Sequence, residues 1–272
     1  MMWLITFVAG IAALLAQVAT ARPVVGNYTI EPRIYGGVEI LNSIPWMTSL
    51  RKRNAHHCGG SLIAARWVLT AAHCVIDKQG ALLSPDLLSV IIGGRVLKQL
   101  DQFQSAGVLQ VIVAPNWDKA QVRNDLALVY LDRPVQATAY AVINGLNTRA
   151  QEADGSSAMA FGWGSTETSG DAMSPVLRGN AVPLVDLARC QQTYGATLIT
   201  ANNICAGAPG KDACTGDSGG PLLAEYAGGI AQVGITSWGS GCGLPGEYGV
   251  YTRVAPYLPW ITQMLKAPRS TG

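Results

Sequence analysis

The sequence has little charge and no long basic run. Charged residues make up 13% of the 272 residues, the net charge is +2, and Lys and Arg are scattered along the chain. Nucleic acid and acidic membrane surfaces bind to concentrated positive charge, so the sequence gives no reason to expect either partner. Hydrophobic residues make up 49% of the chain, which is typical of a globular protein and argues against overall disorder.

Internal repeats, low-complexity tracts and long helical patterns are also lacking. The 31 Gly and 14 Pro residues instead separate short β-branched or apolar runs, at residues 67–70, 88–92, 108–113 and 126–131. Such runs between turn residues predict an all-β fold, and the length allows one or two domains. One helix is expected near the C-terminus, where apolar residues recur at helical spacing over residues 260–265.

Residues 1–21 are interpreted as a signal peptide. Residues 3–19 are almost all apolar, and the small residues Ala19, Thr20 and Ala21 follow the pattern that a signal peptidase accepts. No Lys or Arg precedes the apolar run, so an uncleaved membrane anchor is the alternative, because about 20 apolar residues suffice to cross a bilayer. A cleaved signal peptide predicts a secreted protein, extracellular or, in a bacterium, periplasmic.

The cysteine content agrees with export. Six cysteines permit complete pairing in an oxidising compartment, although composition alone leaves about fifteen connectivities open. Residues 22–33 contain two prolines and show no periodicity, so they are interpreted as a propeptide or linker. They include the run Asn27-Tyr28-Thr29, which is a glycosylation sequon in a eukaryotic host.

Three short motifs supply the groups that peptide-bond hydrolysis by a serine requires. His73 lies in the run TAAHC, Asp125 in the run NDLAL and Ser218 in the run GDSGGP. This chemistry needs a base to take the hydroxyl proton, an acid to orient the base, and donors for the developing oxyanion. Each residue alone has a simpler explanation, as a buried polar group, a cap or a turn. The three motifs together favour catalysis.

With these motifs the chain resembles the chymotrypsin and trypsin family. The order His, Asp, Ser is that of the family, and the runs IYGG, CGGSL, GWG and SWG match it at residues 34–37, 58–62, 162–164 and 237–239. The resemblance covers residues 34 to about 266. It implies a serine endopeptidase domain over residues 34–272, built from two packed six-stranded antiparallel β-barrels and a C-terminal helix, with the catalytic groups between the barrels.

The resemblance also implies a role for each catalytic residue. Ser218 attacks the substrate carbonyl, His73 acts as general base and then as general acid, and Asp125 fixes the histidine tautomer. The backbone amides of Gly216 and Ser218 form the oxyanion hole, and glycine at position 216 reaches unusual backbone angles at little cost. No cofactor is expected.

For the cysteines, the resemblance implies three disulfides. They join Cys58 to Cys74, Cys190 to Cys205, and Cys214 to Cys242. The first would brace the loop of His73, the second would close a surface loop, and the third would tie together the walls of the specificity pocket. Each would add roughly 2 to 4 kcal/mol to stability.

Substrate specificity follows from the residues that match the primary pocket of trypsin. Asp212, six residues before Ser218, matches the floor of that pocket. The other matching residues are Ser237, Trp238, Gly239 and Gly249. A buried carboxylate favours a cationic ligand, so cleavage is expected after Arg and Lys. Ala213 replaces a serine that helps trypsin bind an ammonium group, whereas a guanidinium can form two hydrogen bonds to Asp212, so Arg should be preferred.

Activation is implied at the bond between Arg33 and Ile34. In the family, cleavage there frees the amine of Ile34, which folds inward and pairs with Asp217. In the precursor, a histidine at the place of His56 hydrogen-bonds that aspartate instead. The chain is therefore expected to be a zymogen. Because Arg33 is itself basic, self-activation is a hypothesis that the specificity suggests.

Metal binding has little support in the sequence. His56 and His57 are adjacent, but neighbouring residues of a strand point to opposite faces and no third ligand is evident. The loop that begins at residues 93–96 lacks most of the acidic residues that hold calcium in trypsin, and Asp101 alone is insufficient. No metal is therefore expected. Tyr248 stands at a position where tyrosine accompanies sodium binding in the family, which leaves a sodium effect open.

Two other classes of function are the alternatives. An inactive homologue that serves as a binding protein would normally lack His73 or Ser218, and an elastase-like or chymotrypsin-like enzyme would lack the acid at Asp212. The sequence contains all three residues. We therefore expect an enzyme that acts on protein or peptide substrates containing Arg or Lys. A monomer is expected, and protein inhibitors are compatible with this function.

Overall fold

The computed structural model describes residues 37–143, 153–167, 172–226 and 229–268. The predicted signal peptide and propeptide, with Asn27, Arg33 and Ile34, lie outside the described residues, and so does the segment that forms the alternative membrane anchor. Among the helices in the described ranges, none is both long and apolar enough to cross a membrane.

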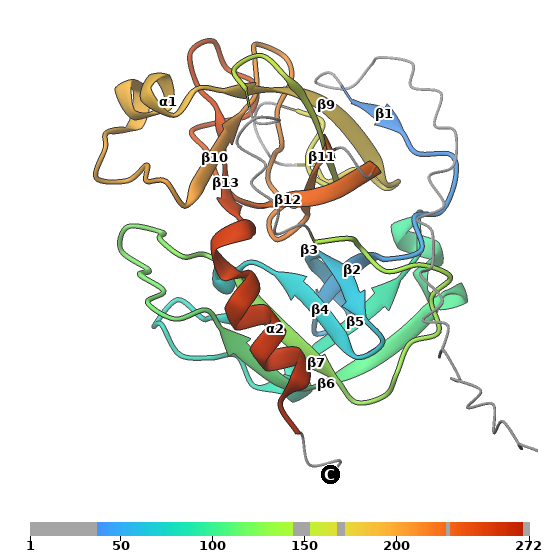
Figure 1. Ribbon diagram of the computed structural model, residues 1–272. Helices are drawn as coiled ribbons and strands as arrows, with labels where there is room; N and C mark the ends of the chain where they lie inside the picture. The colour runs from blue at the N-terminus through green and yellow to red at the C-terminus, as the bar shows by residue number, and fades with distance from the viewer. Residues whose placement is uncertain (1–36, 144–152, 168–171, 227–228, 269–272) are drawn as a thin grey trace, which may run out of the picture.

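The first barrel is built from the strands of the N-terminal half of the chain. The strands pair in the closed order β2-β3-β4-β7-β6-β5, and the pairs are antiparallel. Their bounds are β2 Met47–Lys52, β3 Ala55–Ala64, β4 Trp67–Thr70, β5 Leu88–Ile92, β6 Gln104–Val113 and β7 Ala127–Leu131. This barrel is the lower, blue-to-green part of Figure 1.

The second barrel is built from the strands of the C-terminal half. Its order is β9-β10-β13-β12-β11-β8, and the pairing of β8 with β9 closes it, while the short strand β1 (Val38–Glu39) extends β9 at the edge. The bounds are β8 Ser157–Gly162, β9 Arg178–Val185, β10 Asn203–Ala206, β11 Pro221–Tyr226, β12 Gly229–Trp238 and β13 Gly249–Arg253. The expected fold of two six-stranded antiparallel β-barrels is thereby confirmed.

The strands form where the short apolar runs of the sequence place them. The runs at residues 67–70 and 88–92 coincide with β4 and β5, and those at 108–113 and 126–131 fall largely within β6 and β7. Strands β4 and β7 are buried along their whole length, so both faces of each strand are covered. Each fully buried Leu or Val contributes roughly 1.5 to 3 kcal/mol when it leaves water, which is why these runs define the first barrel.

The expected C-terminal helix is also present. It is α2 (Leu258–Lys266), with Pro259 in the first turn, and its buried residue Ile261 packs into the core of the first barrel. Figure 1 shows α2 leaving the second barrel and running along the first. The short 3-10 helices are η1 Ala72–Val75, η2 Pro85–Leu87, η3 Leu97–Gln102 and η5 Ala255–Tyr257.

A second helix, α1 (Leu187–Tyr194), was not expected from the sequence. The Asp186 carboxylate caps its start by accepting hydrogen bonds from the first backbone N–H groups of the helix, and Gly195 ends it with φ of 89°. Among the residues of α1 only Cys190 is buried. The helix therefore shows capping signals, but it lacks the apolar stripe on which a sequence-based prediction depends.

The two barrels meet along a seam of buried polar contacts. Ser61 Oγ on β3 donates a hydrogen bond to Gln232 Oε1 on β12 at 2.6 Å. Gly59 N, also on β3, donates to Ser218 O at 2.7 Å. These contacts join a strand of the first barrel to a strand and a loop of the second, and the candidate catalytic residues lie along the same seam.

Candidate active site

His73 and Asp125 form a hydrogen-bonded pair in the first barrel. His73 lies in η1, which follows β4, and Asp125 lies just before β7. Asp125 Oδ1 accepts a hydrogen bond from His73 N at 2.9 Å, and Asp125 Oδ2 lies 2.7 Å from His73 Nδ1. A carboxylate can only accept, so Nδ1 carries a proton, and a neutral His73 has its free lone pair on Nε2.

The surroundings of this pair favour proton uptake by His73. The Asp125 side chain is wholly buried, whereas that of His73 is 32% exposed. Burial by itself would lower the pKa of His73, but the charge of Asp125 and the hydrogen bond to it outweigh burial and raise that pKa above its usual value. Ser237 Oγ donates to Asp125 Oδ2 at 2.5 Å, so a residue of β12 in the second barrel helps to hold the acid in place.

Ser218 lies in the glycine-rich loop between β10 and β11. Gly216 has φ of 100° and Gly219 has φ of 77°, which is the left-handed region that favours glycine. A Cβ added at Gly219 would lie 2.6 Å from Gly59 O, so the loop packs directly on β3 of the first barrel. Within the described part of the chain the Ser218 hydroxyl makes no hydrogen bond to His73. Such catalytic bonds are often long in free enzymes and shorten with substrate.

His56 holds the carbonyl group of Gly216. His56 Nε2 lies 3.1 Å from Gly216 O, and His56 Nδ1 lies 2.8 Å from Ser49 Oγ on β2. Because a carbonyl can only accept, Nε2 carries the proton and Nδ1 accepts from the Ser49 hydroxyl. Burial lowers the pKa of His56 to about 4, so the ring stays neutral at physiological pH. Among the hydrogen bonds of the described residues, His56 thus pairs with Gly216 and Ser49, and the expected bond to Asp217 is not present.

The Asp217 carboxylate lies among backbone groups of the second barrel. It accepts hydrogen bonds from Gly164 N at 2.7 Å and from Cys214 N at 2.8 Å. Burial raises the pKa of Asp217 to about 6, although these two bonds act in the opposite direction. A Cβ added at Gly162 or Gly164 would collide with the carboxylate, so the two glycines of the run GWG leave the space that Asp217 occupies.

A cavity of about 320 Å³ opens beside Ser218. Four residues of the expected pocket line it: Ser237, Trp238, Gly239 and Gly249. The fifth, Asp212, is not among the residues that line this cavity; it lines a smaller cavity that shares Ala213, Cys214 and Cys242 with the first. Asp212 lies next to Gly249, because a Cβ added at Gly249 would lie 2.6 Å from Asp212 Oδ1. The structure therefore places four of the expected pocket residues around one cavity next to the candidate nucleophile, with Asp212 beside one of them, Gly249.

Asp212 is 9% exposed and is held by backbone donors. Its Oδ1 accepts from Ala213 N at 2.8 Å and its Oδ2 accepts from Gly243 N at 3.0 Å. Burial raises the pKa of Asp212 to about 7, and backbone hydrogen bonds only partly offset this effect. A bound cation would favour the ionised form of this carboxylate, so a positively charged ligand would bind more favourably here than a neutral one.

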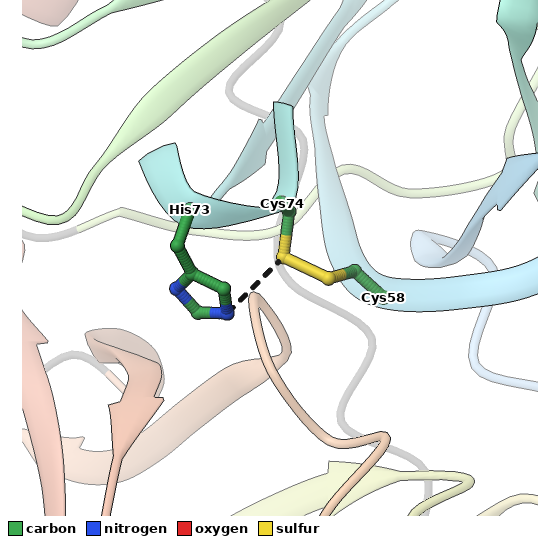
Figure 2. Close-up of side chains that lie close together, drawn as sticks. All are labelled: Cys58, His73 and Cys74. Atoms are coloured by element: carbon green, nitrogen blue, oxygen red, sulfur yellow. Dashed lines mark hydrogen bonds between the residues drawn. A yellow bond between two sulfur atoms is a disulfide. The ribbon is translucent and has the colours of Figure 1, made fainter. Parts of the chain in front are cut away.

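The six cysteines form three disulfides, Cys58–Cys74, Cys190–Cys205 and Cys214–Cys242. Figure 2 shows the first of them beside the imidazole, with His73 Nε2 at 3.7 Å from Cys74 Sγ. These three side chains have the composition of a zinc site, but zinc binds thiolates, and here the two sulfur atoms are bonded to each other at 2.03 Å. This cluster is therefore a disulfide that buttresses His73, and not a set of metal ligands.

The fold and the site together define a class of protein. Two packed β-barrels that bring a carboxylate, an imidazole and a serine to their seam, next to a pocket, are the arrangement of a serine-type hydrolase. The family model described as Trypsin matches residues 34–261 of the chain. The chain belongs to the trypsin family, and it is a serine endopeptidase that hydrolyses proteins.

Several site contacts were not foreseen from the sequence. Ser237 was expected as a pocket residue, and it does line the cavity, but its hydroxyl also bonds to Asp125. Ser49 lies next to His56 only because β2 and β3 pair, and no motif surrounds it. Partners of this kind are set by strand pairing, which a search for short motifs does not detect.

Proposed function

We propose that Ser218, His73 and Asp125 are the catalytic residues of this endopeptidase. The bonds from His73 to the wholly buried Asp125 support this role most directly, because they leave the lone pair of Nε2 free to take a proton. The Ser218 oxygen bonds to the substrate carbonyl carbon while its proton passes to Nε2. The same proton then goes to the leaving amine as the peptide bond breaks, and water repeats these steps to release the acid.

The proposed oxyanion hole consists of the backbone amides of Gly216 and Ser218. Negative charge develops on the substrate oxygen when Ser218 attacks, and preorganised N–H donors stabilise that charge. The left-handed backbone of Gly216 and the hydrogen bond from His56 to its carbonyl oxygen support this role, because both restrict the orientation of the loop.

We propose cleavage after Arg and Lys, with Arg preferred. The support is the carboxylate of Asp212, which lies next to Gly249 of the cavity wall, and the absence of a side chain at Gly239 or Gly249 to fill the space. A guanidinium can contact a carboxylate through two parallel hydrogen bonds. An ammonium group would need a further hydroxyl partner, and Ala213 has no hydroxyl group. Protein or peptide substrates that contain Arg or Lys follow as partners.

We further propose that the chain is a secreted zymogen, activated by cleavage between Arg33 and Ile34. A second cavity, of about 30 Å³, is lined by both Gly37 and Asp217. Gly37 lies three residues after Ile34, and three extended residues span roughly 10 Å, so the freed amine can reach this carboxylate. The raised pKa of Asp217 supports the pairing, because a cation stabilises the ionised form of a buried acid.

The three disulfides support export, with residues 1–21 as the signal peptide and residues 22–33 as the propeptide.

One experiment tests the catalytic proposal and the specificity together. The protein processed at Arg33 is incubated with a peptide library, and the residue before each cut is identified by mass spectrometry. We expect cuts after Arg, fewer after Lys, and none in the Ser218→Ala variant. A neutral organophosphate should label Ser218 in the processed enzyme. Failure of both labelling and cleavage would favour the inactive homologue, and cuts mainly after Phe or Ala would contradict the role of Asp212.

A further inference from the structure

A cluster of three polar side chains lies directly beside Asp125 and outside the proposed triad. Asn124 comes from the first barrel, whereas Asn202 precedes β10 and Tyr257 lies in η5 just before α2. Tyr257 Oη donates to Asn124 Oδ1 at 2.6 Å, and Asn202 Nδ2 lies 3.4 Å from the same oxygen. The Asn124 amide is held at its other end as well, because its Nδ2 donates to Asn116 O at 2.6 Å.

The backbone of Asn124 determines how Asp125 is presented. Asn124 has φ of 55°, a left-handed conformation that asparagine tolerates better than most residues with a side chain. Leu126 N donates back to Asn124 O at 2.8 Å, which closes a three-residue turn with Asp125 at its centre. The direction of the Asp125 side chain is therefore tied to the conformation of Asn124, and the cluster holds that conformation.

The charge of Asp125 also acts on Tyr257 of the cluster. Burial raises the pKa of Tyr257 to about 12, and the negative charge of Asp125 contributes to that rise. The Tyr257 hydroxyl therefore stays protonated and remains a donor throughout the physiological range. Asp125 is wholly buried, so water cannot compensate for a change in its orientation.

We propose that Tyr257, acting through Asn124, is a positioning residue for Asp125. This inference rests on the proposed role of Asp125 in catalysis. It assigns a function in the catalytic site to the C-terminal segment, since Tyr257 is the last residue before α2. The competing explanation is that the cluster only stabilises the loop.

The test uses Tyr257→Phe, which removes one hydroxyl and keeps the ring. The rate at which a neutral organophosphate labels the processed enzyme is measured against pH, since this reagent does not use Asp212. We expect the maximal rate to fall roughly tenfold, because small misplacements of catalytic groups lower rates strongly. We also expect the pKa of His73 in this profile to move down towards its usual value, because Asp125 raises it. Burial lowers the pKa of the nearby His57, so that group titrates below His73, whose pKa is raised. Affinity for benzamidine should not change.

Asn124→Gly is the second variant, because glycine keeps the left-handed backbone while the side-chain contacts are lost. Its effect should resemble that of Tyr257→Phe, and the double variant should be no slower than either single one. Tyr130→Phe, which removes a hydroxyl from a tyrosine of β7, is the matched control and should leave the pKa of His73 unchanged. An unchanged pKa in both cluster variants, or failure of both to fold, would overturn the inference. Absence of labelling in the unaltered enzyme would instead overturn the proposed function.

Discussion

The two barrels share a topology but shape their functional loops in different ways. Among the described residues, those with positive φ that are not glycine all lie in the first barrel: Arg53, Asn54, Asn116, Val122 and Asn124. The loops between β10 and β13 in the second barrel instead use glycine at such positions, including Gly216, Gly219, Gly241 and Gly243. The loops of the first barrel therefore have side chains at most of their described positive-φ positions, with glycine at positions 80 and 93, whereas the second barrel uses glycine there throughout the described residues.

This difference corresponds to a division of chemical work. The first barrel carries the proposed proton-transfer pair, His73 and Asp125, whose properties depend on the hydrogen bonds of the Asp125 carboxylate. The second barrel carries the proposed amide donors and the pocket, whose shape depends on close backbone approach. Changes in the first barrel should therefore alter mainly kcat and its pH profile, and changes around the pocket should alter mainly substrate selection.

The largest effect is expected from Asp125→Asn in the first barrel. The amide cannot hold the correct tautomer of His73, so kcat should fall by about 10⁴-fold, which is the general figure for this exchange in the family. Steady-state kinetics on an arginyl peptide measure the change. Asp132→Asn, at an exposed position after β7, is the control. A loss of activity that came only from a higher KM, with kcat unchanged, would contradict the division between the barrels.

Asp212→Asn in the second barrel should have the next largest effect. Loss of the buried charge removes one partner of the proposed ion pair with substrate, so kcat/KM for arginyl peptides should fall roughly 100-fold to 1000-fold. Labelling of Ser218 by a neutral organophosphate should continue at nearly the same rate. Glu225→Gln on β11 serves as the control. Equal losses in both measurements would mean that Asp212 supports the site as a whole.

Changes of pH separate the two barrels without mutation. Burial raises the pKa of Asp212 to about 7, and a cation binds only the ionised form, so benzamidine affinity should weaken about tenfold for each pH unit below 7. Organophosphate labelling instead requires neutral His73, so its rate should fall on acidification through a pKa above 6.5. The Asp212→Asn variant should lose only the first dependence. If the Asp212→Asn substitution shifted both pH profiles, the two regions would not titrate independently.

The smallest effect on activity is expected from removal of the Cys190–Cys205 disulfide. The two cysteines are 15 residues apart, so the double change to alanine should lower the free energy of unfolding by roughly 3 kcal/mol. Chemical denaturation measures this loss, and kcat/KM should change less than twofold.

Replacement of both Cys214 and Cys242 by alanine should also weaken benzamidine binding, because Cys242 lines the cavity. Equal benzamidine affinities would show that the pocket does not need its disulfide.

The sequence predicted the parts of this protein that depend on local patterns. Buried strands such as β4 and β5 were predicted from apolar runs, and the helix α2 from its apolar spacing. The contact between His56 and Gly216 joins residues 160 positions apart, so no local pattern reports it. The same holds for Tyr257 and Asn124, which are 133 positions apart. The helix α1 was missed because it lies on the surface with a single buried residue.

The seam between the barrels determines when the proposed catalytic residues can come together during synthesis of the chain. The Ser218 loop is held by Gly59 of β3, and Asp125 is held by Ser237 of β12, so each barrel needs the other. The last helix, α2, then covers the core of the first barrel with Ile261. A chain that has emerged only as far as β7 contains the proposed acid and base, Asp125 and His73, without the proposed nucleophile, Ser218. The proposed catalytic site thus needs both barrels, and a partly synthesised chain that lacks the second barrel has no assembled site with which to cut its neighbours.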